Sequence, residues 1–177
     1  NIGVLETSGI DMTASWRAAL ADLGLERVPG SVSLDVSLNY VLNFDAQDFP
    51  TQPKLDMKGT NNFGGIFDYR TVTTLRYYNG RFNTSLNWRY LPGLKHATYP
   101  SNPTTTARGT SAYNVFNLAA GYEVSSSVSV MGGVDNLFSR QPPTYGATNI
   151  STGAGTTLPG FYDTLGRYFY LSARMKF

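Results

Sequence analysis

The sequence has 177 residues and contains no cysteine. This absence excludes disulfide bonds, thiolate metal sites and cysteine nucleophiles. It holds one histidine, His96, with no partner at the spacing of a metal site or a catalytic triad, and we interpret His96 as a solvated loop residue. Charge is scarce and balanced, because 14 Lys and Arg against 12 Asp and Glu leave a net charge of +2. A nucleic-acid partner is therefore not expected.

Long hydrophobic runs are also missing. No stretch approaches the roughly 18 apolar residues of a transmembrane helix, and the mean hydropathy is −0.22. A membrane β-barrel stays compatible with these values, because half of each of its strands faces a wet lumen. No signal peptide opens the chain, and Asn1 is not a natural start. We therefore expect a processed product or a piece of a longer chain.

Patterns that carry catalysis or bind cofactors are not found. Gly64-Gly65 and Gly132-Gly133 lack the strand–turn–helix context of a phosphate loop. Asp45, Asp48 and Asp56 do not match an EF-hand, and solvation in a loop is the preferred interpretation. The sequence therefore predicts no enzyme, no cofactor and no metal site.

Alternation of apolar and polar residues is the dominant pattern that is present. At the end of the chain, Phe169, Leu171, Ala173, Met175 and Phe177 share one face of a predicted strand. The same alternation predicts strands over residues 10–20, 31–44, 68–78, 81–92, 111–124, 127–138 and 165–177. A helix over residues 14–23 is the alternative for part of the first strand. Residues 1–9 are expected to be the end of a loop.

Strand and loop lengths favour a membrane barrel. The run over 31–44 is long for a soluble strand, which typically has about 5–6 residues, whereas a tilted membrane strand needs about 9–11. Short turns at 21–30, 79–80 and 125–126 alternate with long loops at 45–67, 93–110 and 139–164. Bacterial outer-membrane barrels have short periplasmic turns and long extracellular loops. The chain thus predicts an all-β, antiparallel, up-and-down transmembrane barrel section of about seven long strands.

The charged residues of the predicted strands agree with that prediction. They fall on the polar side of the alternation: Arg17, Asp35, Arg76, Arg89, Glu123, Arg174 and Lys176. A soluble β-sandwich would place its charges in the same way, with the apolar side in a core. It would not readily carry long strands whose apolar side holds Trp16, Trp88 and several tyrosines near the strand ends. Outer-membrane lipid is therefore the expected neighbour of the apolar side.

The end of the chain resembles a known family. Val134-Asp135-Asn136-Leu137-Phe138, then Tyr162-Asp163 and Gly166-Arg167-Tyr168-Phe169-Tyr170-Leu171, is similar to the C-terminal signature of TonB-dependent outer-membrane receptors. Ser139 stands where that family often has Asp. The resemblance implies a barrel of about 22 strands around an N-terminal plug. Residues 1–177 would then be the C-terminal part of that barrel, without the plug and the earlier strands.

The resemblance implies partners and a function. The partners are the rest of the barrel and the plug, TonB through the missing N-terminal part, and the barrel-assembly machinery. We expect Phe169, Leu171 and Phe177 to form the signal that this machinery recognises, and Arg17, Asp35, Arg89 and Arg174 to face the lumen and the plug. The expected function is TonB-dependent uptake of a scarce nutrient across the bacterial outer membrane, such as an iron–siderophore, a cobalamin-like compound or an oligosaccharide.

The long loops supply candidate ligand contacts. Aromatic rings can stack on a ligand or make apolar contact with it. The candidates are Phe63, Phe67, Tyr99, Tyr145, Phe161 and Tyr162. The competing interpretation is that the loops pack on one another. Asn136 is expected either to hold its loop by hydrogen bonds or to cap its strand, and Arg167 to pair with Asp163 or a neighbouring strand.

Two other functions stay open at this point. One is an autonomous small outer-membrane barrel, acting as an adhesin, a structural protein or a porin-like channel. The other is a soluble, carbohydrate-binding β-sandwich.

Overall fold

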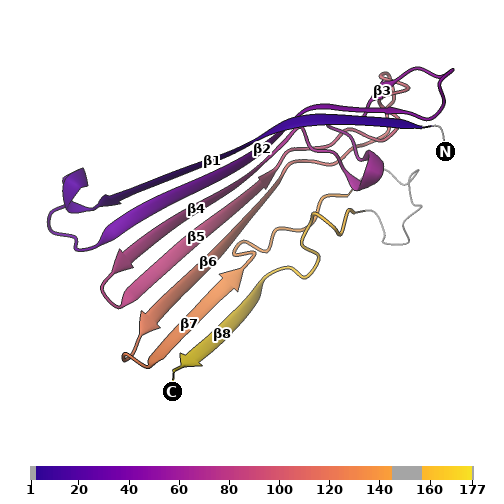
Figure 1. Cartoon of the computed structure of the whole chain (residues 1–177). Coiled ribbons are helices and arrows are strands. Elements are labelled where there is room, and N and C mark those ends of the chain that lie inside the picture. Colours follow the sequence, from indigo (N-terminus) through magenta and orange to yellow (C-terminus); the bar gives the residue numbers. More distant parts are fainter. Residues whose placement is uncertain (1–2, 145–156, 177) are drawn as a thin grey trace.

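The computed structural model describes residues 3–144 and 157–176. In this part of the chain, eight strands form one antiparallel sheet, with the order β1-β2-β4-β5-β6-β7-β8 and β3 paired to β2 (Figure 1). The strands are Val4–Ala19 (β1), Ser31–Gln47 (β2), Leu55–Asp56 (β3), Tyr69–Asn79 (β4), Phe82–Leu91 (β5), Tyr113–Glu123 (β6), Val128–Asp135 (β7) and Tyr168–Met175 (β8). The predicted all-β, antiparallel, up-and-down class with seven long strands is confirmed. The sheet is open, with β1 and β8 at its edges.

Strand β1 starts earlier than the sequence predicted. Residues from Val4 onward already pair with β2, so the predicted loop over residues 1–9 is wrong for that stretch. The pairing register shifts between Ser8 and Gly9, which marks a bulge at this point. A Cβ at Gly9 would lie 2.7 Å from the Tyr40 carbonyl oxygen, so the close approach of the two backbones requires glycine.

The helical alternative for residues 14–23 applies only to the end of that stretch. Strand β1 continues to Ala19, and a single 3-10 turn, Ala21–Leu23 (η1), follows it. Gly24 ends this turn with φ of 81°, a conformation that glycine adopts without strain. None of the helical segments in residues 3–144 and 157–176 has the length and hydrophobicity needed to span a bilayer.

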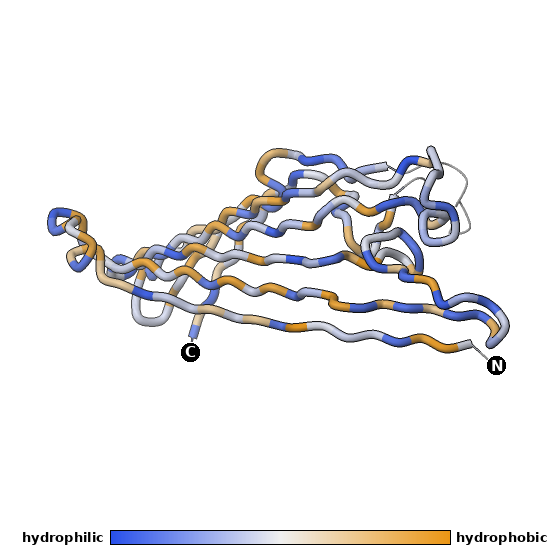
Figure 2. The backbone as a smooth tube through the Cα atoms, turned by 90° about the horizontal axis from the view of Figure 1, so that it is seen from above, coloured by the Kyte–Doolittle hydropathy of each residue, from blue (hydrophilic) through white to orange (hydrophobic). Residues whose placement is uncertain are grey.

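One face of the sheet is apolar and uncovered. The cross-strand register places one residue from each long strand in a continuous row: Trp16, Leu34, Leu75, Leu86, Leu118, Val134 and Phe169. None of these side chains is buried, and Phe169 is 74% exposed. Apolar and polar residues alternate along each strand (Figure 2). A contiguous exposed apolar surface of this size is typical of a surface that meets lipid.

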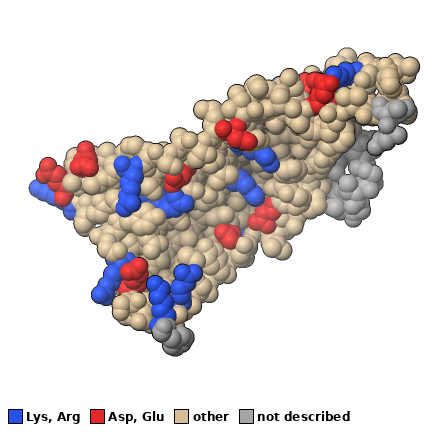
Figure 3. Space-filling model, viewed as in Figure 1, with Lys and Arg blue, Asp and Glu red and all other residues tan. Residues whose placement is uncertain are grey.

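The opposite face is polar and linked by hydrogen bonds. The register places Ser15, Asp35, Thr74, Asn87 and Asn117 in one row on this face, and Asp135 lies opposite Tyr168 on β7 and β8. The Ser15 hydroxyl donates to Asp35 Oδ1 at 2.7 Å, and Arg76 forms an ion pair with the same carboxylate. Side chains of both charges lie along the face seen in Figure 3. This face has the character of a barrel lumen.

The two ends of the sheet differ. The connections β1–β2, β4–β5 and β6–β7 are short and lie at one end, which we call the short-turn end (Figure 1). The long connections lie at the opposite, long-loop end. The C-terminal end of β8 lies beside the β6–β7 turn, where the Lys176 backbone N–H donates to the Ser127 carbonyl oxygen at 2.9 Å. The predicted alternation of short turns and long loops is thus present.

Candidate functional site

Three long connections pack together at the long-loop end. We call residues 48–68, 92–112 and 157–167 the loop cap. The first two are joined by backbone hydrogen bonds, because Asn61 N donates to Lys95 O at 3.0 Å and Lys95 N donates to Gly59 O at 2.7 Å. Leu94 and Thr110 also pair through both backbone amides, at 3.1 and 2.7 Å. These bonds hold the loops in a defined arrangement.

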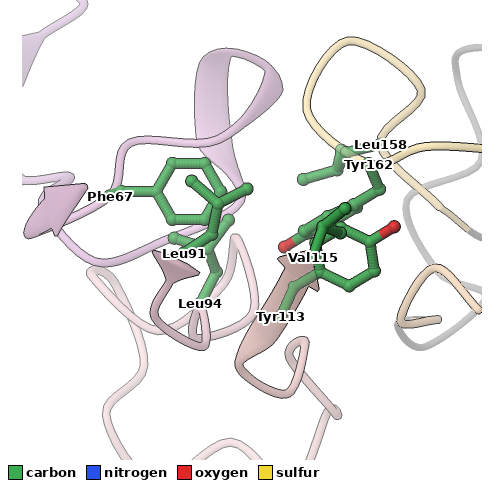
Figure 4. Close-up of a cluster of buried hydrophobic side chains, with 7 residues drawn as sticks. All are labelled: Phe67, Leu91, Leu94, Tyr113, Val115, Leu158 and Tyr162. Atoms are coloured by element: carbon green, nitrogen blue, oxygen red, sulfur yellow. The ribbon is translucent and has the colours of Figure 1, made fainter. Parts of the chain in front are cut away.

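A small hydrophobic core lies beneath the loop cap (Figure 4). It consists of Phe67, Leu91, Leu94, Tyr113, Val115, Leu158 and Tyr162. Phe161 packs against it, with its ring 5.0 Å from that of Phe67 in an edge-to-face arrangement. Burial raises the pKa of Tyr162 above the ordinary value of 10.0, although the hydrogen bond with Thr110 lowers it in part. The core fixes the segment 157–167 against β5 and β6.

A basic recess of about 710 Å³ opens in the loops beside this core. Lys95, Arg108 and Arg140 line it, together with His96 and Tyr99, and no acidic residue is among the described residues of its lining. The Lys95 Nζ atom lies 3.9 Å from the centre of the Tyr99 ring, within the range of a cation–π contact. All three cationic side chains are exposed. We call this cavity the basic loop recess; its charge and its aromatic ring suit an anionic ligand.

A second recess, of about 470 Å³, lies on the polar face below the loop cap. It spans strands β1, β2, β4 and β5, and Phe161 of the cap also lines it. Asn39 connects two charges here, because its Nδ2 donates to Asp11 Oδ1 at 2.8 Å and its Oδ1 accepts from Arg70 at 3.2 Å. Arg89 lines the same recess, and among the described residues its guanidinium forms no ion pair.

The predicted aromatic ligand contacts are divided by the structure. Phe67 and Tyr162 are buried in the core of the loop cap, so they pack loops together and leave no surface open to a ligand. Tyr99 lines the basic loop recess, and Phe161 lines the recess on the polar face. Phe63 is 64% exposed and lies against Phe44, with their ring centres 5.8 Å apart. Tyr145 lies outside the described residues.

The residues predicted to face the lumen all lie on the polar face. Arg17 donates to Ser31 Oγ at 3.2 Å, Asp35 pairs with Arg76, and Arg89 lines the recess below the cap. Arg174 lies opposite Ser129 near the short-turn end. On the apolar face of the edge strand β8, Phe169 and Leu171 are 74% and 84% exposed. Phe177, the third residue of the predicted assembly signal, lies outside the described residues.

Three further interpretations from the sequence can be compared with the structure. His96 is buried at 1% exposure and its Nδ1 accepts from the Thr98 backbone N–H at 3.3 Å, so its description as a solvated residue is wrong. Arg167 donates to the Leu137 carbonyl oxygen at 3.3 Å rather than pairing with Asp163. Asp45 on β2 lies opposite Asp56 on β3 in the strand register. No group of metal-binding side chains occurs among residues 3–144 and 157–176.

The three cations of the basic loop recess were not singled out from the sequence. Lys95 and Arg108 come from the β5–β6 connection and Arg140 from the segment after β7. The signal available was the absence of Asp and Glu from residues 92–112, a stretch that holds Lys95 and Arg108. Arg140 could not have been added to that group, because only the packing of the loops brings it there.

The comparisons with known proteins agree with this architecture. The family described as "TonB dependent receptor-like, beta-barrel" matches residues 1–137. The chain belongs to this family of TonB-dependent receptor barrels. Membership of this family places the barrel in the bacterial outer membrane, and it confirms the prediction that the chain is not an enzyme, because the members are receptors.

A curated relative is similar over most of the chain. The ferric enterobactin receptor PirA of Pseudomonas aeruginosa is 32% identical over 150 residues. The match covers 85% of this chain but 19% of PirA, so the chain spans about a fifth of the length of that relative. No solved structure matches the chain significantly.

Proposed function

We propose that residues 1–177 form the C-terminal section of the barrel of a TonB-dependent receptor that imports an anionic iron chelate. The observation that carries the choice of ligand is the basic loop recess, whose described lining holds three cations and the Tyr99 ring but no carboxylate. The name of the relative PirA supports it, since the catecholate groups of enterobactin make its iron complex anionic.

The open sheet supports the assignment to a section of a larger barrel. Strands β1 and β8 each have one side paired, and in a membrane the free sides need partners because no water is present to bond the backbone. Earlier strands of the same receptor supply these partners. This argument favours a receptor section over the autonomous small barrel, and the exposed apolar row argues against a soluble sandwich.

The remaining parts of the receptor give the proposed transport cycle. The long loops face outward and collect the chelate, the short turns face the periplasm, and the polar face lines a lumen that holds a plug. TonB supplies energy through the plug, and the barrel-assembly machinery inserts the barrel by recognising its last strand, including Phe169, Leu171 and Phe177.

Binding to the intact receptor tests the proposed ligand. Ferric enterobactin is the anionic probe, and a neutral ferric hydroxamate chelate serves for comparison. Lys95→Gln, Arg108→Gln and Arg140→Gln are each expected to weaken binding of the anionic probe about two- to fivefold, because an exposed charge contact contributes up to about 1 kcal/mol. The losses should shrink as salt screens the charges.

Arg81→Gln is the matched control, because Arg81 lies at the short-turn end, between β4 and β5. It should leave binding unchanged. Equal affinity for the anionic and the neutral chelate, or unchanged binding in all three recess variants, would overturn the proposed ligand class.

A further inference from the structure

We infer that Asn136 is the residue that positions Arg140 in the basic loop recess. The inference rests on the proposed function, because it concerns how the recess holds one of its charges. Asn136 follows the last residue of β7 and is buried at 1% exposure. Arg140, four residues later, is exposed and lines the recess.

The Asn136 side chain binds both polar groups of the Arg140 backbone. Its Oδ1 accepts from the Arg140 N–H at 2.7 Å, and its Nδ2 donates to the Arg140 carbonyl oxygen at 3.0 Å. A buried amide that makes both bonds fixes the position and the orientation of that peptide segment. Among the side chains, the amides of Asn and Gln carry a neutral donor and acceptor side by side.

Asn136 is itself anchored to the sheet. Its backbone N–H donates to Asn117 Oδ1 on β6 at 2.9 Å, and the next amide, of Leu137, donates to the Phe116 carbonyl oxygen at 2.7 Å. Its φ of 51° lies in the left-handed region, which Asn tolerates better than most residues. Beyond β7 the chain therefore continues alongside β6 toward Tyr113, the first residue of that strand.

That path brings Arg140 to the recess. The Arg140 guanidinium donates from Nη2 to the Ala112 carbonyl oxygen at 3.4 Å, just before β6. The Tyr113 hydroxyl lies 3.5 Å from the Arg140 carbonyl oxygen, on the same peptide that Asn136 binds. The rest of the recess is built mainly by the β5–β6 connection. The contacts that bring Arg140 to it begin at Asn136.

Asn136→Gly in the intact receptor tests this role. Glycine accepts the left-handed backbone, so the turn is kept while both side-chain bonds are lost. Ferric enterobactin binding should weaken about threefold or more, while the amount of receptor in the outer membrane stays at the wild-type level. Ser139→Gly is the matched control, since Ser139 has a similar φ of 52° but, among the described residues, makes no such pair of side-chain bonds to the Arg140 backbone. The Ser139→Gly receptor should bind ferric enterobactin as the wild type does.

The decisive readout is a double-mutant cycle with Arg140→Gln. If Asn136 acts through Arg140, Asn136→Gly adds little to the loss already caused by Arg140→Gln. The salt dependence of binding should fall by the same amount in both single variants.

Other outcomes distinguish a failure of the role of Asn136 from a failure of the proposed function. Additive losses in the cycle, or unchanged binding by Asn136→Gly beside weakened binding by Arg140→Gln, would overturn the role of Asn136 and leave the proposed function standing. Unchanged binding by Arg140→Gln alone would remove the contact through which Asn136 acts, whereas unchanged binding by all three recess variants would overturn the proposed function. If Asn136→Gly reduced the amount of inserted receptor, binding measured per inserted receptor would let the same cycle decide.

Discussion

The hydroxyl groups of Tyr162 and Thr110 lie 3.1 Å apart, and both residues are buried in the loop cap. They come from different connections, so this hydrogen bond joins segment 157–167 to segment 92–112. The Thr110 hydroxyl also accepts from the Leu94 backbone N–H at 3.0 Å. Two loops that are far apart in the sequence are therefore joined at a buried point.

Tyr162→Phe should loosen the loop cap without unfolding the barrel. The substitution leaves the Thr110 hydroxyl with one partner fewer, which costs about 0.5–1.5 kcal/mol. Hydrogen exchange of the intact receptor should show faster exchange in residues 92–112 and 157–167. Tyr122→Phe, at the short-turn end of β6 where Tyr122 is 48% exposed, should change neither segment. Unchanged exchange in the loop cap would contradict the proposed role of this bond.

High pH should open the cap through the same residue. Burial raises the Tyr162 pKa above 10.0, so the folded state holds the phenol proton more tightly than the unfolded state. The stabilisation is complete below pH 10.0 and is lost as the pH rises through the raised pKa of the folded state. Absorbance at 295 nm, compared between the wild type and Tyr162→Phe, should show one tyrosine that ionises above its ordinary value. A difference curve centred near pH 10 would contradict this prediction.

Gly133 and Gly132 on β7 should respond differently to a methyl group. A Cβ at Gly133 would collide with the Tyr170 ring and lie 2.8 Å from the Leu118 carbonyl oxygen. A Cβ at Gly132 would have its nearest neighbours at 3.5 Å. Gly133→Ala should therefore cost about 1–3 kcal/mol, while Gly132→Ala should be close to neutral. Thermal unfolding in detergent measures both, and equal melting temperatures would show that Tyr170 does not need the space.

A charge on the apolar face should be costly, and a charge on the polar face should not. Leu75 lies in the middle of the apolar row, and Leu75→Arg is expected to cost about 2–4 kcal/mol at bilayer depth. Ser37 is exposed on the polar face of β2, so Ser37→Arg should have little effect. The amount of folded receptor in the outer membrane reports both outcomes. Equal losses in the two variants would contradict the assignment of the faces.

The alternation of side chains was enough to predict the sheet. Leu34 and Asp35 are neighbours in the chain and point to opposite faces, and the same rule holds for each long strand. It failed where an apolar residue lies on the polar side. Leu91 and Val115 are such residues, and they are buried because the loop cap folds over them. A rule that concerns only neighbours along one strand cannot foresee what a distant loop covers.

The candidate site was predictable only in part. Tyr99 was identified because an aromatic ring in a loop is a general ligand contact, and it does line the basic loop recess. Arg140 was not grouped with Lys95, because 44 residues separate them in the chain and packing alone brings them together. His96 is buried by the same packing, which a lone histidine in a loop sequence does not reveal.

The central claim is that the apolar face of the sheet meets lipid and the polar face meets water. The chain has no cysteine, so nitroxide labels at Leu75→Cys and Ser37→Cys place the two faces directly. In the intact receptor in lipid bilayers, dissolved oxygen concentrates in the bilayer. Collisions with oxygen should therefore speed the relaxation of the label at residue 75 and have little effect on the label at residue 37. Oxygen contact at residue 37, or shielding of residue 75 from lipid, would contradict the account.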